Sequence, residues 1–379
     1  MDFRLPDDLL ALQKSVRDFC EKEVKPFARK WDEEEKFPAA TVAKLGELGI
    51  LGMNVPEELG GSALTALGIA TVIEEIARYD GSLALTVASH NGLCTNHIRN
   101  FGSPEQVKKW LPKLASGEAM GAWALTEPGS GSDAAGLLTR AVRKGSGWVL
   151  NGSKMWITQG TVGGIYVILA QTTPERKQKG ITAFLVEPGT PGFKAVAINH
   201  KLGMRSSDTA ELIFEDCELP DSARVGEVDA GFVNTLTILD KGRITIGALA
   251  VGLGRGALEE GVAYAKERKA FGQAIAEFQA IRFMLADIRT ELEASRLLVQ
   301  RAADLCDRRQ PYGKEASMAK LFASEAASRA CNKSLQIHGG YGYTKDFPVE
   351  RYLRDAKLCE IGEGTSEIQR MVIGREILK

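Results

Sequence analysis

Three stretches of the chain are rich in glycine, hydroxyl and carboxylate residues, and the last of them contains the best candidate for a catalytic group. Glu363 lies between two glycines, which leave its carboxylate uncrowded and let a flat ring or a thioester lie against the backbone. Thr365 or Ser366 could cap a following helix, with Glu367 in its first turn. From these residues alone, an exposed acid at a helix–loop–helix junction is an equally good interpretation.

The other two stretches are glycine-rich loops. Consecutive N–H groups in the segment 123–133 (WALTEPGSGSD) could meet an anionic or polar ligand, although an isolated loop of this kind is by default a surface turn. The segment 336–346 (QIHGGYGYTKD) is more typical of a helix end than of a phosphate site. His338 has no second histidine nearby, so we expect it to form a structural hydrogen bond.

Composition places the chain among ordinary globular proteins. Its 379 residues, 44% hydrophobic and 26% charged, predict two or three packed units, and the net charge of −1 gives no reason to expect a nucleic-acid or membrane partner. The six cysteines are scattered, with neither a CxxC pair nor a Cys/His cluster. We therefore expect no bound metal, no disulfide framework and a reducing compartment.

The N-terminus and the apolar segments favour a soluble intracellular protein. The opening MDFRLPDDLL is acidic and lacks an apolar core behind a basic flank, so we expect no targeting peptide. The longest apolar helical stretch, 244–253, is too short for a span of about 18 residues. The expected location is the cytoplasm, or the mitochondrial matrix if the chain is a processed form.

Hydrophobic periodicity divides the chain into helical, β and helical parts. Helical spacing runs through residues 7–118 and returns from about 232, whereas the part between has frequent turns and short strand-like runs. Asn151-Gly152 is typical of a hairpin turn. The predicted strands are 148–150, 165–170, 182–186, 193–198 and 210–214.

The fold class that follows is α+β in three domains. We expect an all-α N-terminal domain (1–119), a central antiparallel β-barrel or sandwich (120–230) and a C-terminal four-helix bundle (231–379).

Six ordered motifs along nearly the whole chain resemble the acyl-CoA dehydrogenase family, of the short- or medium-chain or branched-chain, bacterial-like type. The motifs are LTE…GSD (125–133), MWIT (155–158), GMRSSDT…FEDCELP (203–220), ERKAFG with Gln279 (267–279), Q…GGYG…R…D (336–355) and EGTSEIQR (363–370).

The resemblance implies FAD as cofactor, together with a set of residues that would hold it. The flavin would be lined by two segments, and the adenosine half would be bound mainly through a neighbouring subunit. The residues implied for FAD are Trp123, Leu125, Thr126, Gly131, Ser132, Trp156, Ile157, Thr158, Arg268, Phe271, Gln279, Gln336, Gly339, Gly340, Thr365 and Glu367.

The resemblance also implies the reaction and the partners. Glu363 would abstract the α-proton of an acyl-CoA, flavin N5 would take the β-hydride, and an electron-transferring flavoprotein would reoxidise the cofactor. The residues implied for the substrate are Ser132, Asp240, Arg243 and Gly364. A site shared between subunits implies a homo-oligomer, usually a tetramer in this family.

Two departures from the family's patterns bear on the base and the substrate. Some family members do not have their base at the position of Glu363. These members carry an acidic residue just before the position of Arg243, where this chain has Gly242. Many straight-chain members carry an aromatic residue just before the base, where this chain has Gly362. We expect the base at Glu363 and tolerance of branched or cyclic acyl groups, unless a neighbouring side chain fills the gap.

Three alternatives stay open. A glutaryl-CoA-type dicarboxyl substrate ranks second, because the helical segment between Arg78 and Arg99 has no Lys or Arg to pair with a second carboxylate. A flavin oxidase or monooxygenase of the same fold is disfavoured by the intact Glu363-Gly-Thr motif. A FAD-containing, nucleic-acid-associated protein is disfavoured by the net charge as well.

Overall fold

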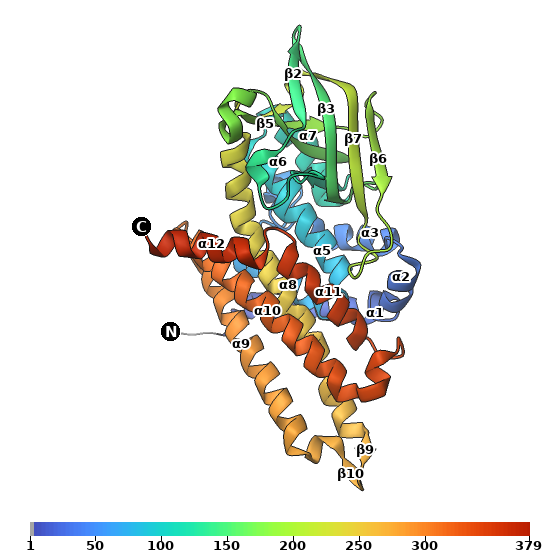
Figure 1. The fold of residues 1–379 in the computed structure, drawn as a ribbon. Helices are drawn as coiled ribbons and strands as arrows, with labels where there is room; N and C mark the ends of the chain where they lie inside the picture. Colours follow the sequence, from blue (N-terminus) through green and yellow to red (C-terminus); the bar gives the residue numbers. More distant parts are fainter. Residues whose placement is uncertain (1–3) are drawn as a thin grey trace.

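The computed structural model describes residues 4–379; the first three residues, which open the acidic N-terminal stretch, lie outside the described residues. An N-terminal helical domain, a central sheet and a C-terminal helical domain follow one another along the chain (Figure 1). The fold class predicted from the sequence is confirmed in this order of domains. No helix within 4–379 is both long and apolar enough to cross a membrane.

The N-terminal domain is built from helices that begin where the sequence provides a cap or suitable charges. Asp7 and Asp8 occupy the first turn of the first helix, and Ser103 forms a capping box with Gln106 at the last. A π-helical turn, η3, interrupts the long helical segment at His90–Thr95. The helices are α1 Asp7–Glu23, α2 Ala28–Glu34, α3 Ala39–Glu47, α4 Ala66–Ala77, α5 Gly81–Ser89, α6 Asn96–Phe101 and α7 Pro104–Ser116.

The central domain is an eight-stranded sheet in the order β6-β7-β3-β2-β4-β5-β8, with β1 paired to β4. Both β1 and β2 run parallel to β4, and the other pairs are antiparallel. The strands are β1 Gly121–Ala124, β2 Arg140–Lys144, β3 Gly147–Thr158, β4 Ile165–Gln171, β5 Ile181–Val186, β6 Phe193–Ala197, β7 Thr209–Pro220 and β8 Arg224–Val225.

The sheet differs in two respects from the expected antiparallel barrel. It is mixed, and it is not closed, because the terminal strand β8 has only two residues and pairs with β5 alone in the described chain. The expected hairpin turn at Asn151-Gly152 is also wrong. These residues lie inside β3 at a register shift against β7, and the turn into β3 is at Gly145-Ser146.

The C-terminal domain consists of three long helices and two shorter ones. Within 4–379, α8, α9, α10 and α11 form the expected four-helix packing, and α12 lies as a fifth helix against α10. A small hairpin connects α8 to α9 at the end of the molecule away from the large sheet (Figure 1). The elements are α8 Gly231–Glu267, β9 Lys269–Ala270, β10 Gln273–Ala274, α9 Gln279–Asp307, α10 Gly313–His338, α11 Val349–Ile361 and α12 Ser366–Ile377.

The two helical domains share one hydrophobic core, whereas the sheet has a core of its own. Residues of α4, α8 and α10, such as Ile73, Leu249 and Ala323, belong to the same buried cluster. A second cluster joins α6 and α7 to one face of the sheet, through residues such as Ile98, Leu111 and Val167. The sheet is therefore fixed against the helices that carry the candidate site.

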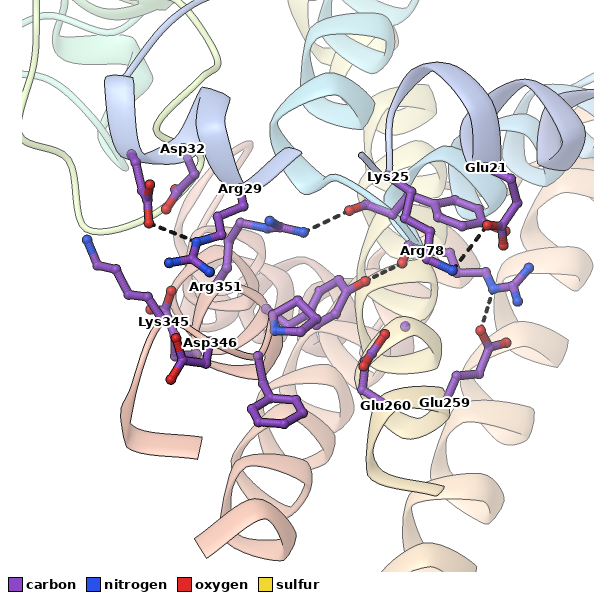
Figure 2. Close-up of a pocket in the computed structure, with 17 residues that line it drawn as sticks. Glu21, Lys25, Arg29, Asp32, Arg78, Glu259, Glu260, Lys345, Asp346 and Arg351 are labelled. Carbon is purple, nitrogen blue, oxygen red and sulfur yellow. Dashed lines mark hydrogen bonds and ion pairs between the residues drawn. The ribbon is translucent and has the colours of Figure 1, made fainter. Parts of the chain in front are cut away.

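A charged cavity of about 260 Å³ lies between the two helical domains. Figure 2 shows acidic and basic side chains from α1, α2, α8 and α11, and that of Arg78 just after α4, converging on it. The Arg351 guanidinium donates to the Tyr79 carbonyl oxygen at 3.0 Å. Several of these charges are paired with one another, as in the 3.1 Å ion pair of Lys25 with Glu21. Neither Glu363 nor the glycine-rich loop at 123–133 lines this cavity.

Candidate active site

Glu363 lies in a tight turn between two helices of the C-terminal domain. The helix α11 ends at Ile361, and Thr365 caps α12 by accepting a hydrogen bond from the Ile368 N–H. Glu363 adopts a φ of 53° and Gly364 a φ of 92°. A left-handed conformation is uncommon for a residue with a side chain, so the surrounding contacts must hold this turn in place.

The Glu363 carboxylate lies directly over α8. A Cβ atom added at Gly242 would come within 2.1 Å of Glu363 Oε2, so only glycine at this position leaves room for the carboxylate. Oε2 is buried and has no hydrogen-bond partner among the described residues. Burial raises the pKa of Glu363 to about 7, and the charges of Lys320 and Arg243 oppose that rise.

The implied substrate residues Asp240 and Arg243 flank Gly242 on the same helix. The Arg243 guanidinium donates to the Asp240 carboxylate and, at 3.4 Å, to the Ser317 hydroxyl. Burial lowers the pKa of Arg243 and raises that of Asp240, and each opposes the other's shift through its charge. The structure therefore places a partly buried ion pair within one helical turn of Gly242, the residue that the Glu363 carboxylate faces.

The two segments implied to line the flavin are joined to each other in the central domain. The Met155 N–H donates to the Thr126 carbonyl oxygen at 2.8 Å. The buried Lys154 ammonium donates to the Leu125 carbonyl oxygen at 3.0 Å and to the Glu127 carboxylate at 2.7 Å. These bonds fix the loop that follows β1 against the end of β3.

The exposed groups of these segments fit a flat, polar ligand such as a flavin. Trp156 has a φ of 64° and leaves 60% of its side chain exposed, while Thr126 and Thr158 are half-buried. A Cβ added at Gly131 would meet nothing within 4 Å, so the loop is open there. Ser132 is exposed, whereas Trp123, Leu125 and Ile157 are buried in the domain cores.

One helical segment borders both Gly242, which Glu363 faces, and the first of the two segments implied to line the flavin. Leu93, in the π-helical turn η3, has its Cδ2 atom 3.7 Å from the position that a Cβ on Gly242 would occupy. One turn further on, His97 Nδ1 accepts a hydrogen bond from Trp123 Nε1 at 3.2 Å. The segment 90–97 therefore connects Glu363 with the first flavin-lining loop.

The remaining residues implied for FAD lie elsewhere. Thr365 and Glu367 are next to the base, but six others lie at the far end of the molecule, around β9–β10 and the turn after α10 (Figure 1). The Arg268 guanidinium lies 5.7 Å from the centre of the Tyr341 ring, which links the two halves of that group. Phe271 is 96% exposed. The six are Arg268, Phe271, Gln279, Gln336, Gly339 and Gly340.

The structure reveals functional neighbours that the sequence analysis missed. Lys320 and Gln369 are buried against the Glu363 turn, and Lys154 and His97 hold the flavin-lining loops. The sequence pattern could have indicated Lys320, because it is a lone cation on a stripe of alanines at helical spacing. The expected structural role of His338 is supported by its hydrogen bond to the Ser334 carbonyl oxygen at 2.8 Å.

Comparison with known proteins identifies the family. Models of the acyl-CoA dehydrogenase N-terminal, middle and C-terminal domains match residues 6–118, 122–217 and 229–378. The mitochondrial short-chain specific acyl-CoA dehydrogenase of Bos taurus is 46% identical over 99% of this chain and 91% of its own.

Two solved structures have nearly the same fold over their whole length. The butyryl-CoA dehydrogenase of Megasphaera elsdenii has a TM-score of 0.98 at 39% identity, covering 100% of both chains. A chain in a structure reported for the electron transferring flavoprotein of Acidaminococcus fermentans has a TM-score of 0.98 at 42% identity, again covering 100% of both chains.

The chain therefore belongs to the acyl-CoA dehydrogenase family. It is a FAD-dependent oxidoreductase of that family, which confirms the class of enzyme and the cofactor expected from the sequence. Within the described part of the chain, no group of three or more His, Cys, Asp or Glu side chains could hold a metal ion.

Proposed function

We propose that the protein introduces a trans double bond between Cα and Cβ of a short- to medium-chain acyl-CoA, with Glu363 as the base. The observation that carries this proposal is the Glu363 carboxylate, buried over Gly242 with an oxygen that no described residue hydrogen-bonds. Such an oxygen has a lone pair free to receive a proton. Its raised pKa makes it a stronger base than an exposed carboxylate.

Loss of the α-proton requires stabilisation of the charge that develops on the thioester carbonyl oxygen. Fixed backbone N–H donors supply such stabilisation most effectively, and the rigid turn would present the N–H of Glu363 for this purpose. Glu363 receives the proton from Cα as the C=C bond forms. Bound FAD supplies the acceptor for the hydride that leaves Cβ.

Residues near the base would orient the two large ligands. Thr126, Trp156 and Thr158 would contact the flavin ring, and Ser132 would lie between FAD and the CoA arm. Asp240 and Arg243 would contact the CoA moiety, because their ion pair lies beside Gly242. Gly364, Thr365 and Glu367 would border the substrate and cofactor on the side of the base.

The residues at the far end of the bundle support an oligomer, in this family usually a homotetramer. Arg268 and Phe271 belong to the hairpin region at the end of the molecule away from the large sheet, so they would hold the FAD of a neighbouring subunit (Figure 1). An electron-transferring flavoprotein would receive the electrons. The close likeness to a chain from the Acidaminococcus structure supports that partner.

Two features of the site bear on the acyl group. The three atoms nearest to a Cβ added at Gly362 all belong to Leu358 and lie 3.4 Å or more away, so an uncrowded space beside Glu363 would admit an acyl branch. The described helices α5 and η3, which approach the base, contain no Lys or Arg. A monocarboxylic substrate is therefore favoured over a dicarboxylic one.

The test is an anaerobic titration of the holoenzyme with butyryl-, octanoyl-, isobutyryl-, isovaleryl-, cyclohexanecarboxyl- and glutaryl-CoA, followed by the flavin absorbance. We expect bleaching by butyryl-CoA and at least one branched thioester, and none in Glu363→Gln. Bleaching that persists in Glu363→Gln would remove Glu363 as the base. A protein that no thioester bleaches would have another substrate.

A further inference from the structure

The turn that carries Glu363 is held from one side by a buried lysine on a neighbouring helix. The Lys320 side chain comes from α10 and is 1% exposed. Its ammonium donates to the Gly362 carbonyl oxygen at 2.7 Å and also to the Gly364 carbonyl oxygen. One cation therefore binds the carbonyl groups on both sides of the base.

A second buried side chain holds the same turn from α12. Gln369 is fully buried, and its Nε2 donates to the Gly364 carbonyl oxygen at 2.9 Å. Glu363 itself has a left-handed backbone conformation, which needs support from its surroundings. Of Lys320 and Gln369, only Lys320 carries a charge. Lys320 therefore contributes to both the geometry and the electrostatics of the turn.

The ammonium acts on the carboxylate without binding its buried oxygen. Lys320 donates to the two backbone carbonyl groups, and Glu363 Oε2 has no hydrogen-bond partner among the described residues. The Lys320 charge nevertheless lowers the pKa of Glu363 against the larger effect of burial. Burial in turn lowers the pKa of Lys320 to about 8, and the Glu363 charge opposes that change.

Other titratable groups face this pair from the remaining helices. Arg243 on α8 lowers the pKa of Glu363 and that of Lys320, and Cys359 on α11 faces Lys320. Arg243 is already paired with Asp240. Lys320 is thus the cation that bonds the base-bearing turn directly.

We propose that Lys320 is a positioning residue that clamps the turn around Glu363 and keeps the carboxylate charged while leaving Oε2 free of hydrogen bonds. A direct ion pair at that oxygen would stabilise the charge but occupy the lone pair that must receive the substrate proton. The backbone-bound ammonium provides the charge and leaves that lone pair available. This inference rests on the proposed role of Glu363 as the base.

The test compares Lys320→Met, Lys320→Gln and Lys320→Arg holoenzymes in the pH dependence of kcat/KM. The acidic limb of that profile reports ionisation of the base in the free enzyme. Without the lysine charge the pKa of Glu363 rises, so the limb moves to higher pH in the Met and Gln variants. We expect kcat to fall about 10- to 100-fold with Met and less with Gln, which keeps an N–H donor.

Two matched variants complete the design. Lys320→Arg retains the cation, so its acidic limb should stay close to that of the wild type. Arg329→Met removes one cation from the same helix, where Arg329 pairs with Glu291, and should leave both the limb and kcat unchanged. An infrared difference titration against Glu363→Gln would follow the protonated carboxyl group directly, without turnover.

The outcomes separate this inference from the proposed function. A Lys320→Met or Lys320→Gln enzyme that is only less heat-stable, with its acidic limb and infrared transition at the wild-type pH, would show a purely structural lysine and refute the inference. If Glu363→Gln itself retained turnover, the proposed function would fail first. If Glu363→Gln is inactive, and Lys320→Met and Lys320→Gln both move the acidic limb to higher pH, the proposed function and this inference are both supported.

Discussion

The position of the proposed base, Glu363, depends on Gly242, which has no side chain. The carboxylate of Glu363 occupies the space that a Cβ on Gly242 would take, with only 2.1 Å between them. Gly242→Ala should push the flexible carboxylate away and lower kcat by about 100-fold, because small displacements of reacting groups are costly. Stability should change by no more than about 1 kcal/mol, since alanine is favoured over glycine in a helix.

Stopped-flow flavin reduction together with thermal unfolding checks this prediction. Gly261→Ala is the matched control on the same helix, where the new Cβ would lie 3.2 Å from the Ser334 hydroxyl and far from the base. Equal reduction rates in Gly242→Ala and Gly261→Ala would mean that the carboxylate does not work from this position.

The second residue-scale prediction concerns Gly362. Gly362→Tyr should fill the space beside the base and lower kcat/KM for isobutyryl-CoA at least tenfold more than for butyryl-CoA, roughly the effect of steric exclusion in a packed pocket. Gly362→Ala is the control, because its Cβ would make only ordinary contacts with Leu358. Steady-state kinetics with isobutyryl-CoA and butyryl-CoA test this prediction. An unchanged ratio in Gly362→Tyr would place the acyl branch elsewhere.

At the scale of helices and strands, the sequence predicted those features that depend only on residues close together in the chain. Of the two caps considered, Thr365 is the one that begins a helix, because a side chain and the backbone three residues on suffice for a cap. The Asn151-Gly152 hairpin failed because β3 continues through it to pair with β7, a contact with residues far along the chain. The parallel pairing of β1 with β4 is non-local for the same reason.

In the candidate site, too, some features could be predicted from neighbouring residues in the chain, whereas others depend on tertiary packing. The position of Glu363 between glycines could be read from the sequence, but its contact with Gly242 depends on how α8 packs against the turn. The bonds of Lys320 to that turn likewise arise from packing of α10, which no local pattern specifies. The sequence therefore singled out Glu363 as the candidate base, and tertiary structure was needed to find what holds it.

The helix that leads to the base carries a buried acid whose ionisation should affect stability. Asp355 on α11 accepts a hydrogen bond from the Met204 N–H, with an N···O distance of 2.6 Å, and burial raises the pKa of Asp355 to about 7. An acid whose pKa is raised in the folded state binds more protons there than in the unfolded chain. The free energy of unfolding should therefore fall as pH rises from about 4 to about 7 and level off above that.

Asp355→Asn keeps the acceptor for Met204 and removes the ionisation. We expect the variant to gain stability over the wild type at about pH 8.5, by at most about 4 kcal/mol, and to lose more than half of that gain at about pH 5. Urea unfolding at both pH values measures it, with Asp304→Asn on the exposed end of α9 as a control. A gain that is the same at both pH values would contradict a buried ionisation.

At the scale of the whole molecule, the two main groups of residues proposed to bind FAD lie toward opposite ends of a long helical domain. The flavin-lining loops belong to the sheet, and the group with Arg268 and Phe271 belongs to the far hairpin (Figure 1). Phe271 is almost fully exposed, and aromatic side chains are enriched where a protein surface contacts another subunit. Two subunits arranged so that each completes the other's site would bury it.

This arrangement predicts complementation between two inactive variants. Glu363→Gln lacks the base but keeps the far hairpin, and the double variant Arg268→Ala with Phe271→Ala keeps the base but lacks the FAD contacts of the hairpin. If the site is shared, a mixed pair contains one subunit with an intact base and a partner with an intact hairpin. Each mixed pair then has one complete site of its two, so purified mixed pairs should have about half of the wild-type activity.

Co-expression with two different affinity tags, followed by purification through both, isolates the mixed oligomer for assay. Flavin content per chain and the rate of butyryl-CoA oxidation should both exceed those of either variant alone. A site formed within a single chain would leave every subunit in the mixture defective in one of the two functions, and activity would stay at the background of the parents. Recovered turnover would therefore require that Arg268 and Phe271 serve the flavin of the neighbouring subunit.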